Sequence, residues 1–290
     1  MGQTVPMAPR VTISTENGIA DVRLDRPDKL NALDTPMLDG ILQAGEQLAA
    51  DPSIRVVVLS GEGRGFCAGL DAASLGAIAG GSPGDPDPEF ADAYAHFATV
   101  AGPIAERMDG RITNVYQQVA HQWSTLAVPV IAACHGVVFG GGLQIALGAD
   151  IRFTAPDAKW SVLEIRWSLL PDMTGIPQLI RLAGLDVVKE LAFTGRMLSG
   201  TEAVDLGVAT HVSDTPHDDA MALAAEIADK NPDAIRGMKA LCNAAGTRPL
   251  AASYLEESQL MERLIGSPNQ VEATMAYLEK RDPVFVDPTG

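Results

Sequence analysis

Three consecutive glycines, Gly140 to Gly142, lie between an apolar run of strand type and an apolar segment of helix-forming residues. Glycines at the beginning of a helix let a ligand approach the backbone closely, and the first N–H groups of a helix have no partner within it. Such N–H groups can hold a polarised or anionic oxygen, which is the chemistry of an oxyanion hole. A tight structural turn is the alternative explanation for these glycines.

A second glycine-rich loop, residues 61–71, follows a strand-like apolar run over residues 56–59. A Walker loop would need Gly-Lys-Ser/Thr at its end, and a dinucleotide fingerprint would need the order G-x-G-x-x-G. Neither pattern occurs in the two glycine loops. The loops are therefore not nucleotide-binding motifs.

Two carboxylic acids and one amide follow the glycine triplet and bear on proton transfer. Glu164 has apolar neighbours, which can raise the pKa of a carboxyl toward neutral pH, and it is the best candidate for a base. Asp172 stands eight positions further on, and Gln144 lies within the apolar segment. An amide neither takes nor gives up a proton near pH 7, so Gln144 cannot act as acid or base.

Each of these three residues also has a structural explanation. Glu164 can pair with Arg166, provided that the chain is a strand there, because residues two apart share a side only on a strand. Asp172 follows a proline and can serve as a turn or N-cap residue. Gln144 can position a substrate or make a purely structural hydrogen bond. The sequence leaves these alternatives open.

The elements that must position these residues alternate between strands and helices. Residues 11–24 alternate apolar and polar side chains on both sides of Asn17-Gly18, which predicts an antiparallel hairpin. Asp34-Thr35-Pro36 supplies an N-cap and a first-turn proline for a helix that ends near residue 51. We therefore expect an α/β fold in which helices connect parallel strands.

The chain divides into a predicted α/β core over residues 1–210 and a helical region over residues 211–290. A turn-rich stretch of Gly, Pro, Ser and Asp at residues 80–88 marks a predicted lid or insertion over about residues 76–122. Helical patterns rich in Ala, Leu, Glu and Met dominate the last region. Those helices have too few predicted partners within their own chain.

Composition limits the classes of partner. Of the 290 residues 47% are hydrophobic, enough for a sizeable core, and the net charge is −16. Nucleic acids and anionic membranes need a basic face, so neither is expected as a partner, and no run of about 18 apolar residues suggests membrane insertion. The three cysteines lack metal-like or disulfide-like spacing, so no metal is expected. The first ten residues lack the apolar core of a signal peptide, so a cytoplasmic location is expected.

Several ordered motifs resemble the crotonase family, the enoyl-CoA hydratase and isomerase superfamily, over nearly the whole chain. The matching stretches are residues 26–33, 66–71, 129–150, 163–164, 194–196 and 202–208. The resemblance implies a crotonase-like spiral of ββα units with a C-terminal helical region that mediates trimers or dimers of trimers. Neighbouring subunits would then supply the partners that the C-terminal helices lack.

The resemblance also implies a site for an acyl-CoA thioester, with coenzyme A as part of the substrate and no separate cofactor. The backbone N–H groups of Ala68 and Gly141 would hold the thioester oxygen. Arg26 and Lys29 would form a basic patch for the phosphates, although exposed basic residues are often only solvated. The residues expected to bind substrate are Arg26, Lys29, Ala68, Gly69, Leu70, Asp71, Gly140 and Gln144.

The departures from the family pattern favour isomerisation. Hydratases of the family place glutamates at the positions of Gln144 and Glu164, and this pair handles a water molecule. Dienoyl-CoA isomerases have an aspartate at the position of Asp172 and a glutamate that Glu164 matches, and simple enoyl-CoA isomerases rely on that glutamate. We therefore expect Glu164 and Asp172 to carry the protons of a double-bond shift. The alternatives are a hydratase in which Asp172 replaces the missing glutamate, and a catalytically silent acyl-CoA-binding homologue.

Overall fold

The chain begins with the predicted hairpin. The structure, a computed structural model, describes residues 9–71 and 105–288. Strands β1 (Val11–Glu16) and β2 (Ile19–Leu24) pair antiparallel in register from Val11 opposite Leu24 to Glu16 opposite Ile19. Asn17 and Gly18 make the turn with φ angles of 51° and 76°, the left-handed values that such short turns need. The hairpin prediction is confirmed.

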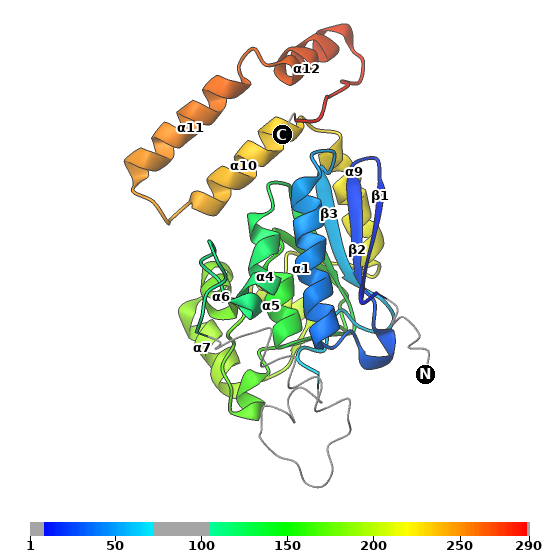
Figure 1. Ribbon diagram of the computed structural model, residues 1–290, viewed down its shortest axis with the longest axis vertical. Coiled ribbons are helices and arrows are strands. Elements are labelled where there is room, and N and C mark those ends of the chain that lie inside the picture. The colour runs from blue at the N-terminus through cyan, green and yellow to red at the C-terminus, as the bar shows by residue number, and fades with distance from the viewer. Residues whose placement is uncertain (1–8, 72–104, 289–290) are drawn as a thin grey trace.

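A six-stranded sheet forms the centre of the fold, in the order β1-β2-β3-β4-β6-β9 (Figure 1). All neighbouring pairs from β2 onward are parallel. A smaller sheet has the order β5-β7-β8. The remaining strands are β3 (Val56–Gly61), β4 (Val130–Cys134), β5 (Val137–Phe139), β6 (Ile151–Thr154), β7 (Lys159–Ser161), β8 (Leu198–Ser199) and β9 (His211–Val212).

Helices cover both faces of the large sheet. Strand β3 separates the two faces, because Val57 and Leu59 join one hydrophobic cluster while Val56 and Val58 join the other. Helices α1 (Thr35–Ala50), α4 (Val115–Thr125) and α5 (Gly141–Leu147) pack on the first face, and α9 (Pro216–Ala228) packs on the second (Figure 1). This layering confirms the α/β class.

Short helices complete the fold around the smaller sheet. They are the 3₁₀ helices η1 (Pro27–Lys29) and η2 (Glu164–Trp167), and the α-helices α6 (Gly175–Leu182), α7 (Leu185–Thr194) and α8 (Gly200–Asp205). No helix of the described ranges has the length and apolar character needed to cross a membrane.

Part of the predicted insertion is a core helix. Residues 76–104 of that segment lie outside the described residues, but residues 115–122 belong to α4, whose Val119 and Trp123 are fully buried. The prediction of an insertion is wrong there because α4 also buries polar side chains, which hid its amphipathic pattern. The Gln122 amide, for example, is buried and donates to the carbonyl oxygen of Ile41 at 2.7 Å.

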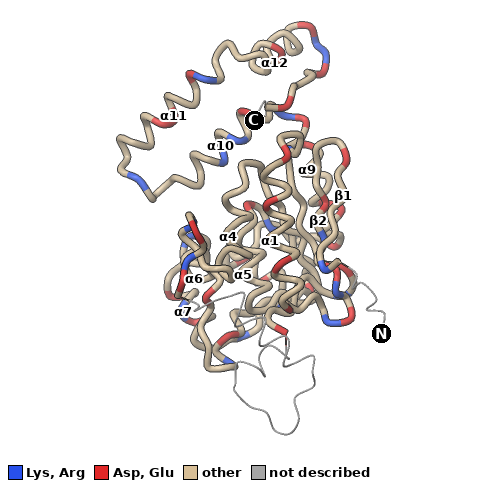
Figure 2. Tube along the Cα trace, in the orientation of Figure 1, with Lys and Arg blue, Asp and Glu red and all other residues tan. Residues whose placement is uncertain are grey.

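The C-terminal region is helical as predicted, but its first helix belongs to the core. Helix α9 buries Ala220, Ala224 and Ala228 against the large sheet. Helices α10 (Pro232–Ala244), α11 (Leu250–Leu264) and α12 (Pro268–Glu279) extend beyond the core, and α11 has no buried residue (Figure 1). Along these helices acidic and basic positions are separated by uncharged stretches (Figure 2). Their role in trimers stays a prediction.

Candidate active site

A cavity of about 630 Å³ lies where both glycine loops meet the carboxylates, and nearly every residue expected at the site lines it. The expected residues in its wall are Lys29, Ala68, Gly69, Leu70, Asp71, Gly140, Gly141, Gln144, Glu164 and Asp172. Arg26 is expected there too but is not part of the wall. The fold thus brings together positions that are up to 143 residues apart in the sequence (Lys29 to Asp172).

The glycine triplet is both a structural turn and a part of the cavity. Gly140 has a φ of 50°, which favours glycine, and its N–H donates to the carbonyl oxygen of Ser161 at 3.0 Å. A Cβ on Gly142 would lie 2.5 Å from the carbonyl oxygen of Cys67, so glycine is needed where the two loops touch. The turn therefore fixes Gly141 against the loop of residues 61–71.

The structure corrects the expected role of Ala68. Its N–H donates to the carbonyl oxygen of Leu30 at 2.9 Å and is therefore already used. Two residues further on, Leu70 forms an isolated parallel bridge with Leu33, in which the residues on either side of Leu70 make the hydrogen bonds. The N–H of Leu70 itself then points away from Leu33.

Leu70 and Gly141 offer backbone donors where the two glycine loops meet the cavity. The N–H of Leu70 has no hydrogen-bond partner among the described residues. Gly141 is the first residue of α5, so its N–H has no partner within the helix. A Cβ on Gly69 would lie 3.3 Å from the nitrogen of Gly141, which shows how closely the two loops approach. Leu70 thus replaces Ala68 as the second candidate oxyanion donor.

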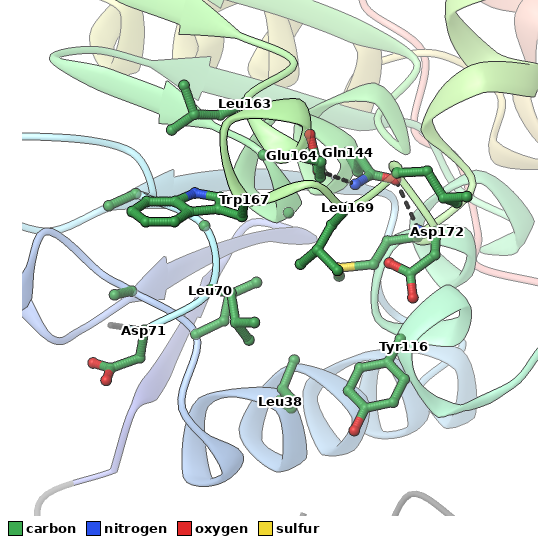
Figure 3. A pocket seen from close by; sticks show the side chains of 18 of the residues that line it. Leu38, Leu70, Asp71, Tyr116, Gln144, Leu163, Glu164, Trp167, Leu169 and Asp172 are labelled. Carbon is green, nitrogen blue, oxygen red and sulfur yellow. Dashed lines mark hydrogen bonds between the residues drawn. The ribbon is translucent and has the colours of Figure 1, made fainter. Parts of the chain in front are cut away.

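Gln144 is held at both ends of its side-chain amide. Its Oε1 accepts the N–H groups of Met173 at 2.8 Å and Gly175 at 2.9 Å. Its Nε2 donates to Oε1 of Glu164 at 2.6 Å, and Figure 3 shows the amide between Glu164 and the turn after Asp172. The structural alternative for Gln144 is therefore realised, with Glu164 as one of the partners.

Glu164 is a largely buried carboxylate without a cation. It forms no ion pair with Arg166 or with any other described residue, so that alternative is not realised. Its Oε2 is buried and has no hydrogen-bond partner. Burial raises the pKa of Glu164, the negative charge of Asp172 raises it further, and the hydrogen bond from Gln144 opposes both effects. The result is a carboxyl suited to exchanging protons.

Asp172 is the second carboxylate of the cavity. It is not a helix cap, because Thr174 occupies the N-cap position of α6. Burial raises the pKa of Asp172 above its usual value. Burial also raises the pKa of Tyr116, which lies across the cavity on α4, and the charge of Asp172 adds to that effect (Figure 3).

The two expected phosphate ligands differ in their surroundings. Arg26 pairs with Asp71 at 2.7 Å and with Asp34 at 3.3 Å, and its side chain is only 12% exposed. Lys29 is exposed at the end of η1 and lines the cavity. Of the two, Lys29 has the placement for contact with a soluble anionic ligand, whereas Arg26 holds the loop that carries Asp71.

Thiol chemistry does not contribute to this site. Cys67 is fully buried in the second loop, and its Sγ donates to the carbonyl oxygen of Asn31 at 3.1 Å. Burial raises the pKa of Cys67 to about 12, so the nucleophilic thiolate is not populated near neutral pH.

Sequence reasoning missed most of the apolar wall. Trp167 and Met173 line the cavity, whereas Trp160 is buried in the core with its indole N–H donating to Thr154. The wall residues that the sequence did not assign to the site are Ala32, Leu33, Leu38, Tyr116, Leu163, Leu169 and Leu170, of which Ala32, Leu33 and Leu163 lie within the matching stretches. Their side chains come from α1, α4 and loops, and an apolar residue in such an element cannot be distinguished from a core residue by type alone.

An α/β fold that places backbone donors and buried carboxylates around an apolar cavity is the arrangement of the crotonase fold. A family model described as enoyl-CoA hydratase/isomerase matches residues 19–286. The chain therefore belongs to the enoyl-CoA hydratase/isomerase family.

Similar proteins cover the chain almost completely. The human protein named enoyl-CoA hydratase domain-containing protein 2, mitochondrial, is 30% identical over 284 residues, 96% of this chain and 88% of the human one. The mouse methylglutaconyl-CoA hydratase, mitochondrial, is 29% identical over 275 residues, 92% of this chain and 79% of the mouse one. The crystal structure of an enoyl-CoA hydratase from Bacillus anthracis has a TM-score of 0.80 at 25% identity and covers 95% of this chain and 98% of that one.

Proposed function

We propose that this enzyme shifts the double bond of an enoyl-CoA or dienoyl-CoA, with Glu164 and Asp172 as proton carriers. The observation that carries the proposal is that the cavity holds two carboxylates with raised pKa values, while an amide, Gln144, occupies the position beside Glu164. One or two carboxylates can move a proton between two carbons without adding water.

The proposed reaction begins at the carbon beside the thioester carbonyl. Glu164 takes a proton from this carbon, and the electron pair of the broken C–H bond moves into the carbonyl to give an enolate. The N–H groups of Leu70 and Gly141 stabilise the enolate oxygen, and one such donor typically contributes about 2.7 to 4 kcal/mol. Glu164 or Asp172 then returns a proton to the far carbon as the electron pair moves back.

The proposed substrate carries its own coenzyme. An acyl-CoA would place its thioester between the loops, its phosphates near Lys29 and its acyl chain among the apolar residues of the cavity. No separate cofactor and no metal enter this scheme. A cytoplasmic location stays a prediction, and the human and mouse relatives are both named mitochondrial.

The experiment that tests the function uses the purified protein with 3-enoyl-CoA and 3,5-dienoyl-CoA in deuterated water. We expect the double bond to move and deuterium to enter the product at the far carbon, which receives the returned proton. The absence of both a double-bond shift and deuterium uptake, with both substrates, would contradict the proposal.

Hydration of 2-enoyl-CoA is the second candidate function. It is favoured by the names of the relatives, which are those of hydratases. In that reaction Asp172 would take the place of the missing second glutamate and handle the water with Glu164. Hydration of crotonyl-CoA faster than the isomerisation of 3-enoyl-CoA, and lost in Asp172→Asn, would favour this candidate.

We also propose that the helices beyond the core assemble the protein into trimers or dimers of trimers. The support is that large apolar side chains of α11, such as Leu250 and Leu255, are 65% and 59% exposed in the single chain. Sedimentation equilibrium tests this, and a monomer at micromolar concentration would contradict it.

A further inference from the structure

Gln144 is the residue through which the two proposed proton carriers are connected. Its Oε1 accepts two backbone N–H groups, from Met173 and Gly175, and only the oxygen of an amide can do so. The orientation of the amide is therefore fixed, and its Nε2 must be the atom that faces Glu164 at 2.6 Å.

This orientation makes the two oxygens of Glu164 unequal. Oε1 must be an acceptor, because the atom opposite it is always a donor. Oε2 is buried and has no partner, so its lone pairs are not used by the protein. A proton that reaches Glu164 therefore resides on Oε2, and the hydrogen bond to Gln144 stays intact in both protonation states.

The other end of Gln144 holds the turn that carries Asp172. Thr174, between the two bound N–H groups, has a φ of 72°, a strained conformation for a β-branched residue. Its Oγ1 is buried without a hydrogen-bond partner, so its own side chain does not stabilise the turn. The two hydrogen bonds to Gln144 are what keep this turn, and with it Asp172, in place.

The surrounding glycines leave room for this arrangement. A Cβ on Gly175 would lie 2.8 Å from Cγ and Oε1 of Gln144, and a Cβ on Gly140 would lie 3.4 Å from Oε1 of Glu164. A larger residue at Gly175 would thus displace the amide from its position.

We propose that Gln144 is a positioning residue, which fixes Glu164 through Oε1 and Asp172 through the Met173–Gly175 turn and leaves Oε2 of Glu164 to carry the proton. The proposal deepens the proposed isomerisation and rests on it for the role of the two carboxylates. In the transfer itself, the C–H bond breaks, its electron pair moves to the thioester oxygen and an O–H bond forms at Oε2. The hydrogen on Oε2 exchanges with solvent, and the O–H bond then breaks as a proton passes to the far carbon, so the enzyme returns to its starting state.

The test compares the wild type with Gln144→Met and Gln144→Glu. Methionine has a similar length but loses all three hydrogen bonds, whereas glutamate keeps an acceptor for the turn and loses the donor to Glu164. The ionisation of Glu164 is followed by infrared difference spectroscopy as the C=O band of its protonated carboxyl, assigned by its loss in Glu164→Gln. Asp172 is the titratable group whose charge acts on Glu164. The band of Asp172 is identified by its loss in Asp172→Asn.

We expect the Glu164 band to persist to a pH about one unit higher in Gln144→Met, because the hydrogen bond favours the charged form. In Gln144→Glu a second carboxylate replaces the donor, so the band also persists to higher pH while the turn is retained. For 3-enoyl-CoA we expect kcat to fall about tenfold to a hundredfold in both variants, with KM within about threefold.

The outcomes separate this inference from the proposed function. A Glu164 titration that is identical in the wild type and both variants would overturn the inference, even if the wild type isomerises its substrate. A shifted titration in a wild type that moves no double bond would support the positioning and contradict the function. Circular dichroism identifies a Gln144→Met protein that fails to fold, and Gln144→Glu then carries the comparison.

Discussion

Two groups of carboxylates lie at or near the same cavity and have opposite surroundings. Asp71 and Asp34 share the guanidinium of Arg26, with side chains that are 11% and 18% exposed. Glu164 and Asp172 have no cation among the described residues, and burial raises the pKa of both. A buried carboxylate that is paired with a cation stays charged and holds structure, whereas one that faces only an amide and apolar groups can exchange protons.

The largest effect is expected where the unpaired group is removed. Glu164→Gln should lower the isomerisation rate of 3-enoyl-CoA by about a thousandfold, because general-base catalysis typically contributes about 10²- to 10⁴-fold. Stopped assays of product formation measure the rate. Glu226→Gln, which changes an exposed carboxylate of α9, is the control and should retain full activity. Comparable rates in the two variants would show that Glu164 is not the proton carrier.

The paired group should affect stability instead. Arg26→Met leaves the buried Asp71 without its ion pair with Arg26, whereas Asp34 keeps Arg10 at 3.0 Å, so the free energy of unfolding should fall by about 3 kcal/mol. Urea denaturation measures this change. The control is Arg64→Met, which changes an exposed arginine in the loop that also carries Asp71. It should change the free energy of unfolding by less than about 0.5 kcal/mol. Equal losses of stability in Arg26→Met and Arg64→Met would show that the ion pair with Arg26 does not stabilise the fold.

Asp172 should have a smaller catalytic effect than Glu164. Asp172→Asn should lower the isomerisation rate by about tenfold to a hundredfold, as expected for a second proton carrier. It should also move the acid limb of the pH–rate profile to lower pH, because the charge of Asp172 raises the pKa of Glu164. A pH–rate profile that keeps its position would show that the two carboxylates do not interact.

The smallest expected effect concerns the pH dependence of stability. The folded-state pKa values of Glu164 and Asp172 are raised above the usual 4.5 and 3.8. The stability that their protonated forms contribute is therefore present below pH 4 and is lost as the pH rises through the folded-state values. The double variant Glu164→Gln/Asp172→Asn should match the wild type near pH 4 and exceed it by about 1 kcal/mol at pH 7 in urea denaturation. A constant difference at both pH values would contradict the raised pKa values.

The sequence predicts the elements that local rules determine. The hairpin around Asn17-Gly18 and the helix capped by Asp34 follow from turn and capping chemistry, and both are confirmed. Glu164 and Asp172 are predicted to share a site, and both line the cavity. In these cases the residue type itself carries the signal.

What the sequence misses depends on contacts between distant segments. The sequence cannot distinguish the N–H of Ala68 from that of Leu70 as a donor. The bridge between Leu33 and Leu70 leaves the N–H of Leu70 free, whereas that of Ala68 is used. From the sequence Arg26 is expected to be free to bind phosphate, but in the fold it pairs with Asp71, which is 45 residues away. Helix α4 lacks a clear amphipathic pattern because it buries Gln122, whose amide finds its partner on α1. None of these three pairings can be derived from local patterns.

The central claim is that the unpaired carboxylates move a proton between carbons and add no water. Mass spectrometry and proton NMR of one reaction with 3-enoyl-CoA in deuterated water test it most directly. We predict the 2-enoyl-CoA product, with deuterium at the exchanged carbon and no added water, and no accumulation of a 3-hydroxyacyl-CoA. A 3-hydroxyacyl-CoA as the main product, formed at a rate that Glu164→Gln abolishes, would contradict the claim and identify the enzyme as a hydratase.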